Sequence, residues 1–316
     1  MFCIGVDLGG TNIAAGIVDE KGTLLRKDSV PTKAGRNPDE IIKDMAELCR
    51  NLIKEQNLAI KDIEYVGIAT PGSADSERGI VVSAYNLGFS NYPLAAKLKE
   101  YLGVEKVLIE NDANAAAKGE AEYGAARHYN DSVMITLGTG VGGGIILGKK
   151  IHSGFNFRAA ELGHVVIELD GLQCSCGRKG CWETYSSATG LIRLTKKKMN
   201  ENKDTLMWEM VDGDENKVSG RTAFDAMRKG DSVAKAVVDR YIYCLAVGIV
   251  NVINALQPEV IVIGGGICNE KEYLTKPLLE IVEEEQHLKP EEKRTIIKIA
   301  ELGNDAGIIG AAMLGY

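Results

Sequence analysis

The stretch Asp7-Leu8-Gly9-Gly10-Thr11-Asn12 separates two apolar runs, residues 2–6 and residues 13–18, at the start of the sequence. Apolar runs on either side of a Gly-rich turn predict a β-hairpin. A third run of this kind, residues 23–30, predicts another strand directly after the hairpin. The sequence therefore predicts a meander of three strands within its first thirty residues.

A second strand-turn-strand pattern occupies residues 133–147, with Leu137-Gly138-Thr139-Gly140-Val141-Gly142-Gly143-Gly144 as its turn. It repeats the order of the first hairpin, as expected of two related halves. A chain of 316 residues is also long enough for two domains, since single cores seldom grow much beyond about 250 residues. We expect two lobes that face each other across a cleft, one made of residues 1–116 with 303–316 and the other of residues 117–302.

The rest of the chain alternates between helical and strand patterns, which is typical of an α/β protein. We expect helices where apolar residues recur at helical spacing, and strands where short apolar runs end in turn residues. The predicted helices are residues 38–56, an Ala-rich segment from residue 112, residues 234–256 and residues 305–310. The predicted strands are residues 63–69, 107–110 and 260–263.

The composition excludes several classes of partner. Lys and Arg number 37 against 44 Asp and Glu, a net charge of -7, so we expect no nucleic-acid partner. The longest apolar stretch, residues 241–256, is interrupted by Asn251 and Asn254, and we expect no membrane span. The first residues contain Asp7 and no basic leader, and seven cysteines are an odd number, which favours a reducing compartment. We expect a cytoplasmic protein.

The two glycine turns are candidate phosphate-binding loops. Gly9, Gly10 and Thr11 form one turn, and Gly138, Thr139 and Gly140 form the other. Without bulky side chains the backbone N–H groups can approach a polyanion, and the threonine hydroxyls add donors. Either turn alone is equally explained by hairpin geometry, and the pairing of the two favours phosphate binding. Asp7, at the end of the first strand, is a candidate Mg²⁺ ligand, with turn capping as the alternative role.

His164, Cys174, Cys176 and Cys181 are candidate metal ligands. One imidazole and three thiolates in so short a segment suffice for a closed tetrahedral Zn²⁺ site, which would be structural because no coordination position stays open. The alternatives are unrelated thiols or a disulfide. Cysteines two residues apart make a strained disulfide, and the compartment is expected to be reducing.

Asp112 is the candidate catalytic residue. Together with Asn111 it ends an apolar strand and begins a helix, where a carboxylate can receive the proton of a substrate hydroxyl during attack on a γ-phosphate. Asp or Asn at this junction is also an effective helix N-cap. From these residues alone, capping is the favoured explanation.

Five motifs, taken together and in their order along the chain, resemble those of the ROK family (repressors, open reading frames and kinases). The resemblance extends from the first strand to the closing Asp305-Ala306-Gly307 segment. The motifs are Asp7-Leu8-Gly9-Gly10-Thr11, Glu110-Asn111-Asp112-Ala113-Asn114-Ala115, Leu137-Gly138-Thr139-Gly140-Val141-Gly142-Gly143-Gly144, Glu161-Leu162-Gly163-His164 and Cys174-Ser175-Cys176-Gly177-Arg178-Lys179-Gly180-Cys181-Trp182-Glu183.

The resemblance implies an actin-like ATPase (ribonuclease H-like) fold, with sugar and ATP in the interlobe cleft. Asp112 resembles the catalytic base of the family. The residues that resemble its sugar-binding residues are Asn111, Glu161, His164 and Glu183, and, in a looser match, Gly72 and Asn86. His164 would then bind zinc through one ring nitrogen and a sugar hydroxyl through the other.

On the nucleotide side, Gly264, Gly265 and Gly266 resemble the adenosine loop of the family. One position departs from the family pattern: many of its kinases have Lys after the Gly-Gly-Thr turn, and this chain has Asn12. The phosphate site therefore has one charge fewer at this position.

The resemblance implies ATP- and Mg²⁺-dependent phosphorylation of a hexose at its 6-hydroxyl, and the segment from Cys174 to Glu183 looks most like the glucokinase branch. Kinases of N-acetylmannosamine or N-acetylglucosamine remain alternatives, since they share nearly the same ligands. A repressor of the family would carry a DNA-binding domain before the first strand, which here begins at residue 2. A non-catalytic sugar sensor would not need Asp7, Asp112 and both glycine turns. The resemblance also implies a homodimer.

Overall fold

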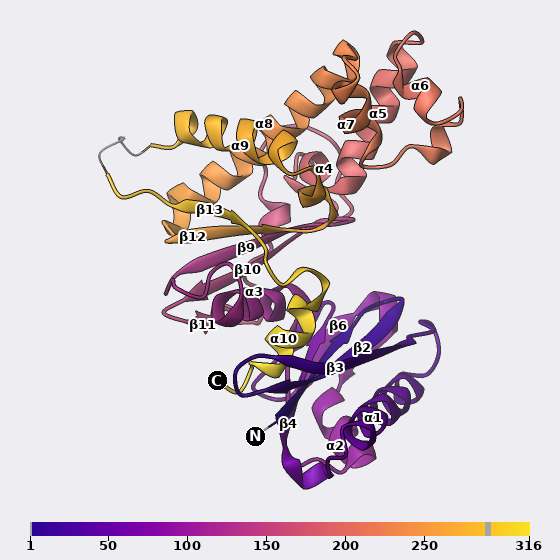
Figure 1. Ribbon diagram of the computed structural model, residues 1–316, viewed down its shortest axis with the longest axis vertical. Helices are drawn as coiled ribbons and strands as arrows, with labels where there is room; N and C mark the ends of the chain where they lie inside the picture. The colour runs from indigo at the N-terminus through magenta and orange to yellow at the C-terminus, as the bar shows by residue number, and fades with distance from the viewer. Residues whose placement is uncertain (1, 288–291) are drawn as a thin grey trace. The chain divides into compact units, whose positions relative to one another are not determined.

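The structure is a computed structural model that describes residues 2–287 and 292–316 (Figure 1). The chain separates into two compact units, and it crosses between them several times. The first unit comprises Met1–Met134, Gly144–Ala160 and Ala300–Tyr316, and the second comprises Ile135–Gly143 and Glu161–Ile299. The lobe boundaries expected from the sequence are not tested by this division and stay a prediction.

The first unit is built on a five-stranded sheet of order β3-β2-β1-β4-β8. β1 and β2 form an antiparallel hairpin, whereas β4 runs parallel to β1 and β8 runs parallel to β4. The carboxyl ends of β1, β4 and β8 therefore meet at one edge of the sheet, where polar residues of separate strands can form a site. The strands are β1 (Phe2–Leu8), β2 (Asn12–Asp19), β3 (Leu24–Pro31), β4 (Ile63–Thr70) and β8 (Val107–Asn111).

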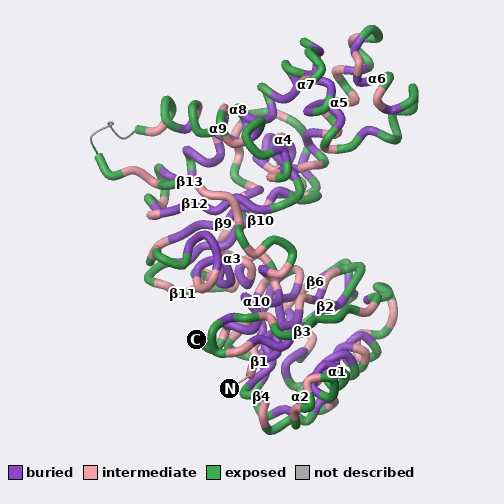
Figure 2. Tube along the Cα trace, viewed as in Figure 1, coloured by how far each residue is buried: buried purple, intermediate pink, exposed green. Residues whose placement is uncertain are grey.

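Helices cover both faces of this sheet. Side chains alternate along β1, so that Ile4 and Val6 belong to the core that also contains the buried residues of α1 (Pro38–Glu55) and α2 (Leu94–Leu102). Cys3 belongs to the opposite core, with residues of α10 (Ala306–Ala312). Figure 2 shows the buried residues along these strands and the inner sides of α1 and α2. Asp7 shares the face of Cys3, which directs it toward α10.

A glycine in β1 allows α10 to approach the sheet closely. A Cβ at Gly5 would lie 1.8 Å from the carbonyl oxygen of Ile308, so no larger residue fits without moving the helix. This contact fixes the start of α10 beside the end of β1: a Cβ at Gly307 would lie 2.7 Å from Oδ2 of Asp7. Small residues in both elements thus bring the C-terminal helix to Asp7.

A small antiparallel sheet of order β5-β6-β7 completes the first unit, together with α3. α3 follows β8 without an intervening loop and packs against α10. The elements are β5 (Ser73–Asp75), β6 (Ile80–Ala84), β7 (Phe89–Tyr92) and α3 (Asp112–Tyr123).

A second five-stranded sheet has the order β11-β10-β9-β12-β13. Its strands are β9 (Ser132–Leu137), β10 (Val141–Leu147), β11 (Lys150–Ile151), β12 (Val260–Gly264) and β13 (Ile296–Ile299). The helices of the second unit are α4 (Glu183–Ser186), α5 (Ala188–Glu201), α6 (Met207–Met210), α7 (Thr222–Arg228), α8 (Ser232–Leu256) and α9 (Glu272–Glu285).

α8 is the one helix of the described residues that is long and apolar enough to cross a membrane by composition. Two thirds of its apolar window, 67%, is buried inside the protein, which is typical of a core helix. Trp182 packs against it at Gly248, where a Cβ would lie 1.9 Å from the indole ring, and the indole N–H donates to the carbonyl oxygen of Cys244 at 3.0 Å.

The secondary structure predicted from the sequence is confirmed. Both hairpins form, with turns at the predicted glycines, and the predicted helices and strands occur within a few residues of the expected bounds.

Candidate functional site

The first glycine turn connects β1 to β2 and is held by backbone hydrogen bonds. The amide of Gly9 donates to the carbonyl of Asn12 at 2.9 Å, and the hydroxyl of Thr32 donates to the carbonyl of Gly9 at 2.7 Å. Gly10, Thr11 and Asn12 are exposed. The turn thus presents exposed backbone beside Asp7, as a phosphate-binding loop requires.

Asp7 lies at the sheet edge close to a second carboxylate. In the register of the sheet it pairs with Ala69 of β4, and Ala69 pairs with Glu110 of β8, directly before Asn111 and Asp112. Burial, together with the negative charge of Asp112, raises the pKa of Asp7 to about 6. Two carboxylates that disfavour each other's charge are a suitable place for a divalent cation, which neutralises both.

The helix cap at the start of α3 is provided by Asn111 and not by Asp112. The side-chain oxygen of Asn111 accepts from the amides of Ala113 and Asn114, at 2.9 and 3.2 Å. Asp112 is the first residue of the helix and is exposed. Asn111 is therefore the N-cap, although a carboxylate oxygen of Asp112 also accepts from the amide of Ala113, at 2.8 Å.

Gly72 lies beside Asn111, whereas Asn86 lies at the first glycine turn. The side-chain amide of Asn111 donates to the carbonyl of Gly72 at 3.0 Å. Gly72 has a φ of 81°, and a Cβ there would lie 2.0 Å from the carbonyl oxygen of Ser83, so this position requires glycine. Nδ2 of Asn86 lies 3.1 Å from the place of a Cβ on Gly10, which brings Asn86 to the first phosphate turn.

Glu110 is a buried acid that the sequence analysis did not single out. Its carboxylate accepts from the amide of Asn111 at 2.9 Å, from Nδ2 of Asn114 at 3.1 Å and from the hydroxyl of Ser153 at 3.3 Å. Burial raises its pKa. The available signal was an acidic residue at the end of an otherwise apolar strand, which predicts a charge that must find partners inside the protein.

In the second unit, the turn at Gly138, Thr139 and Gly140 lies against the Gly264–Gly266 segment. A Cβ on Gly265 would lie 2.3 Å from the carbonyl oxygen of Leu137, and Gly265 has a φ of 101°. The carbonyl of Gly138 accepts from the amide of Ala188, at the start of α5, at 2.9 Å. The structure thus brings together both glycine segments assigned to the nucleotide in this unit.

Glu183 connects this turn to the cysteine cluster. One carboxylate oxygen accepts from the amide of Val141 at 3.0 Å, and a Cβ on Gly140 would lie 2.1 Å from the same oxygen. The other oxygen lies 4.0 Å from the sulfur of Cys174. The sequence analysis placed Glu183 among the sugar residues but did not reveal its contact with the glycine turn, which joins residues 42 positions apart.

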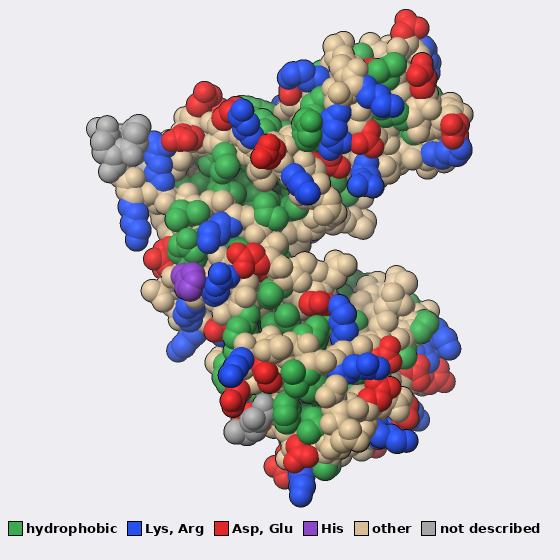
Figure 3. Space-filling view, viewed as in Figure 1, with side chains coloured by type: hydrophobic (Ala, Val, Ile, Leu, Met, Phe, Trp, Pro, Cys, Tyr) green, Lys and Arg blue, Asp and Glu red, His purple; other side chains and the backbone are tan. Residues whose placement is uncertain are grey.

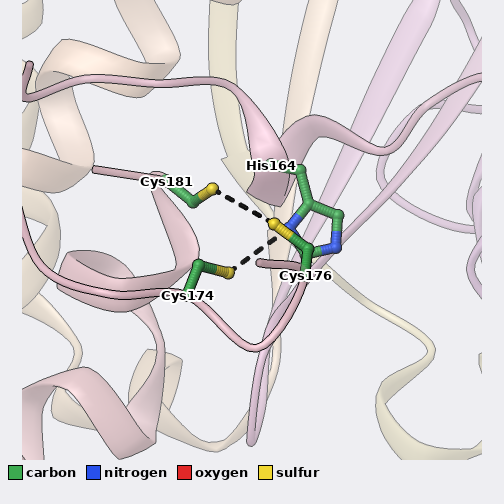
Figure 4. A group of neighbouring side chains, drawn as sticks. All are labelled: His164, Cys174, Cys176 and Cys181. Carbon is green, nitrogen blue, oxygen red and sulfur yellow. Dashed lines mark hydrogen bonds between the residues drawn. The ribbon is translucent and has the colours of Figure 1, made fainter. Parts of the chain in front are cut away.

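The four predicted metal ligands converge. One ligand atom from each of His164, Cys174, Cys176 and Cys181 lies within 4.8 Å of all the others. Nδ1 of His164 is 3.7 Å from the sulfur of Cys174, and the sulfurs of Cys176 and Cys181 are 3.6 Å apart (Figure 4). In a tetrahedral zinc site, with bonds of about 2.3 Å to sulfur and about 2.0 Å to nitrogen, ligand atoms lie about 3.5 to 3.8 Å apart. The two distances of 3.7 and 3.6 Å match these values, and the cluster as a whole is consistent with such a site.

The surroundings shift the thiols of the cluster in opposite directions: a backbone hydrogen bond from Arg178 lowers the pKa of Cys176, whereas the pKa of Cys181 is raised. Burial raises the pKa of Cys181 to about 12, so the thiol by itself stays protonated near neutral pH. A divalent cation supplies the charge that stabilises a thiolate. With Nδ1 of His164 in the cluster, Nε2 is the other ring nitrogen, and it lies 4.0 Å from a carboxylate oxygen of the exposed Glu161. His164 thus connects the cluster to Glu161.

The surface of the molecule carries charges of both signs. On the face shown in Figure 3, Lys and Arg are interspersed with Asp and Glu, and no continuous patch of one sign is visible there. This distribution agrees with the net charge of -7.

Comparisons with known proteins give one consistent result. A model of the ROK family matches residues 3–315. The glucokinase of Thermotoga maritima is 38% identical over 316 residues, which cover 98% of this chain and 96% of that protein. The N-acetylmannosamine kinase of Yersinia pseudotuberculosis is 31% identical over 312 residues, which cover 98% of this chain and 97% of that protein.

A solved structure extends the match to three dimensions. The crystal structure of a ROK family glucokinase from Streptomyces griseus, in complex with glucose and AMPPNP, has a TM-score of 0.82 and 34% sequence identity, and each chain is covered to 99%. The predicted fold class, an α/β chain of the actin-like ATPase type, is confirmed by this match.

Proposed function

This chain belongs to the ROK family, and on that premise we propose that it is an ATP-dependent glucokinase, which transfers the γ-phosphoryl group of ATP to the 6-hydroxyl of glucose. The observation that carries the proposal is the match to glucokinases over essentially the full chain, at 38% identity for one relative and 34% for a structure that contains glucose and an ATP analogue. The proximity of Asp7 and Asp112 and the convergence of the four predicted metal ligands also support the proposal.

Asp112 is proposed as the general base. It stands at the sheet edge beside Asp7, and the neighbouring Asn111 provides the helix cap. In a loose phosphoryl-transfer transition state the protein mainly positions the reactants and neutralises charge. Asp112 would orient the 6-hydroxyl of the sugar toward the γ-phosphate and receive its proton late in the transfer.

Six residues that resemble the sugar-binding residues of the family are proposed to bind the other hydroxyls of the sugar. In the first unit these are Asn111, Asn86 and the backbone of Gly72. In the second unit they are Glu161, His164 and Glu183. Asn111 uses its side-chain oxygen for the helix cap and one amide hydrogen for the carbonyl of Gly72, so its second amide hydrogen is the group that can donate to a sugar hydroxyl.

ATP is proposed to bind through its phosphates to the two predicted glycine turns, with the Gly264–Gly266 segment on the adenosine side. Asp7 would hold Mg²⁺ through its water ligands. When bound, Mg²⁺ neutralises the charge of the transferring phosphates. The exposed backbone of Gly10 and Gly138 is consistent with a close approach of these phosphates.

Zinc is the metal that we propose for the cysteine cluster. Three thiolates and one imidazole are ligands that Zn²⁺ prefers, and four protein ligands leave no open position for catalysis. We propose that zinc holds His164 and the segment before Glu183 in place, so that it orients sugar contacts without taking part in the reaction.

Glucose is proposed as the substrate because the glucokinase relative is more similar to this chain than the N-acetylmannosamine kinase, at 38% against 31% identity. The latter match keeps N-acetylmannosamine as the second candidate. We also propose a homodimer in the cytoplasm. The odd number of cysteines, seven, and the grouping of three of them with His164 as candidate metal ligands support a reducing compartment.

Sugar-dependent ADP release from MgATP tests the proposal. We expect kcat/KM to be highest for glucose in a panel with mannose, fructose, N-acetylglucosamine and N-acetylmannosamine. Asp112→Asn should lower kcat about 100-fold or more while glucose still binds, because the isosteric amide cannot accept the proton. Absence of turnover with every sugar, from folded protein loaded with zinc, would refute the kinase assignment. Near-normal turnover of Asp112→Asn would refute the role of that residue.

A further inference from the structure

Phe155 exposes 99% of its surface, more than any other large apolar side chain among the residues that the structure describes. It lies in the first unit, in the loop of residues 153–160, which joins β11 to the segment of Glu161. A single exposed apolar residue needs no explanation by itself. The contacts of this loop, however, connect it to the proposed sugar-binding residues of the same unit.

The first end of the loop is anchored beside the junction of β8 and α3, which contains Asn111 and Asp112. The hydroxyl of Ser153 donates to the carboxylate of Glu110 at 3.3 Å, and the same carboxylate accepts from the amide of Asn111 at 2.9 Å. The amide of Ala159 donates to the carbonyl of Ser153 at 3.0 Å, which closes the base of the loop. The loop therefore begins beside Glu110, whose carboxylate also binds the amide of Asn111.

The second end of the loop is anchored beside Gly72. The guanidinium of Arg158 lies 3.5 Å from the hydroxyl of Ser83 in β6. The backbone of Ser83 is also the group against which Gly72 packs, since a Cβ on Gly72 would lie 2.0 Å from its carbonyl oxygen. Phe155 thus lies between the two anchored ends of the loop. One end binds Glu110, next to Asn111, and the other contacts Ser83, against which Gly72 packs.

The backbone of the loop adopts left-handed conformations at Gly154, Phe157 and Ala160, with φ values of 74°, 60° and 66°. Such conformations are unfavourable for residues other than glycine and persist where the surroundings hold them, often at ligand-binding segments. Gly154 is also packed tightly, since a Cβ there would lie 2.9 Å from Cβ of Ala159. The loop is held in one shape, and that shape leaves the ring of Phe155 in solvent.

A hexopyranose presents two kinds of surface: hydroxyls around its edge and C–H groups on its faces. The proposed sugar contacts of the first unit, Asn86, Asn111, Asp112 and the backbone of Gly72, are all polar and suit the hydroxyls. An aromatic ring suits the C–H face, and burying it against the sugar removes apolar surface from water. We propose that Phe155 is a further substrate-contacting residue, which packs its ring on the C–H face of the bound hexose. This inference rests on the proposed function.

Glucose binding and turnover of Phe155→Ala and Phe155→Tyr test the inference. Phe155→Ala should raise the glucose KM, and the glucose Kd measured by calorimetry without nucleotide, about tenfold, the loss expected for part of a buried aromatic ring. Its kcat and its KM for ATP should stay within about twofold, because Phe155 is assigned only to the sugar. Phe155→Tyr keeps the ring and should stay close to the wild type.

Leu169→Ala provides a matched control, because Leu169 is 88% exposed and lies in the second unit. It should leave the glucose Kd unchanged. A glucose Kd of Phe155→Ala within about twofold of the wild type would overturn the inference, as would an equal loss in Phe155→Tyr. Failure of the proposed function is a separate outcome, since it would appear as a wild-type protein that neither binds nor phosphorylates glucose.

Discussion

Gly140→Ala is the substitution whose effect the structure defines most sharply. A Cβ at this position would lie 2.1 Å from one carboxylate oxygen of Glu183 and 3.1 Å from the carboxyl carbon. The backbone itself tolerates alanine, since Gly140 is not among the glycines with positive φ. The clash therefore acts on the Glu183 side chain, because its oxygen at 2.1 Å would have to retreat by more than 1 Å to reach an ordinary van der Waals distance of 3.4 Å or more.

The displacement removes a hydrogen bond that positions Glu183. The same oxygen accepts from the amide of Val141 at 3.0 Å, and a bond to a charged group contributes about 1.5–3 kcal/mol. If the carboxylate is a sugar contact that depends on this position, the loss corresponds to a 10- to 100-fold weaker glucose affinity. The nearby cysteine cluster should keep its metal, because Glu183 is not one of its ligands.

The glucose Kd, measured by calorimetry without nucleotide, tests this prediction. Gly138→Ala is the matched control: it lies in the same turn and carries the same added methyl group, yet no heavy atom lies within 4 Å of its Cβ. We expect its glucose Kd to stay within about twofold of the wild type. A folded Gly140→Ala protein that binds glucose as tightly as the wild type would refute the role of Glu183, or the assumption that its position matters.

Two further predictions concern pH and the metal. Because burial and the charge of Asp112 raise the pKa of Asp7 to about 6, kcat/KM for MgATP should fall as the pH drops through about 6, where the carboxylate loses its charge. The effect on stability has the opposite sign. The folded state holds the proton of Asp7 more tightly than the unfolded chain does. Protonated Asp7 therefore stabilises the folded state below the pKa of the unfolded chain, and this stabilisation is lost as the pH rises through about 6. Unfolding measured against pH should lack this change in Asp7→Asn, and an unaltered profile would contradict the assignment. Removal of zinc by a chelator, or Cys181→Ser, should lower Tm and weaken glucose binding, because His164 loses its fixed orientation. Metal analysis and restoration by added Zn²⁺ check the first case, and an unchanged Tm in verified metal-free protein would exclude a structural metal.

Much of the architecture was predictable because its signals are local. The alternation of apolar residues along residues 2–6 and 13–18, with a glycine turn between them, predicted the first hairpin, and the four metal ligands lie close enough in sequence to be recognised as one set. The identity and the order of the five motifs along the chain were likewise sufficient to predict the family. Such patterns depend on residues that are close together in the sequence, so they can be identified without the structure.

The choice between two roles at the start of α3 was not predictable. Asn111 and Asp112 are both good N-caps, and only the dihedral angles at the helix start determine which of them accepts the first amides. In the structure that residue is Asn111. Asp112 is therefore not the N-cap, although its carboxylate also accepts from the amide of Ala113 at 2.8 Å.

The sequence by itself determined the strands, the helices, the glycine turns and the set of candidate metal ligands, since each is encoded within one short segment of the chain. Only the tertiary structure decided which distant groups meet: Glu183 with Val141, Glu110 with Ser153, and Gly307 with Asp7. These contacts follow from strand register and from the close approach of α10 to Gly5, which are set by the packing of the whole unit. No local pattern records that packing, because the partners are far apart in the chain and each side chain alone is compatible with many neighbours.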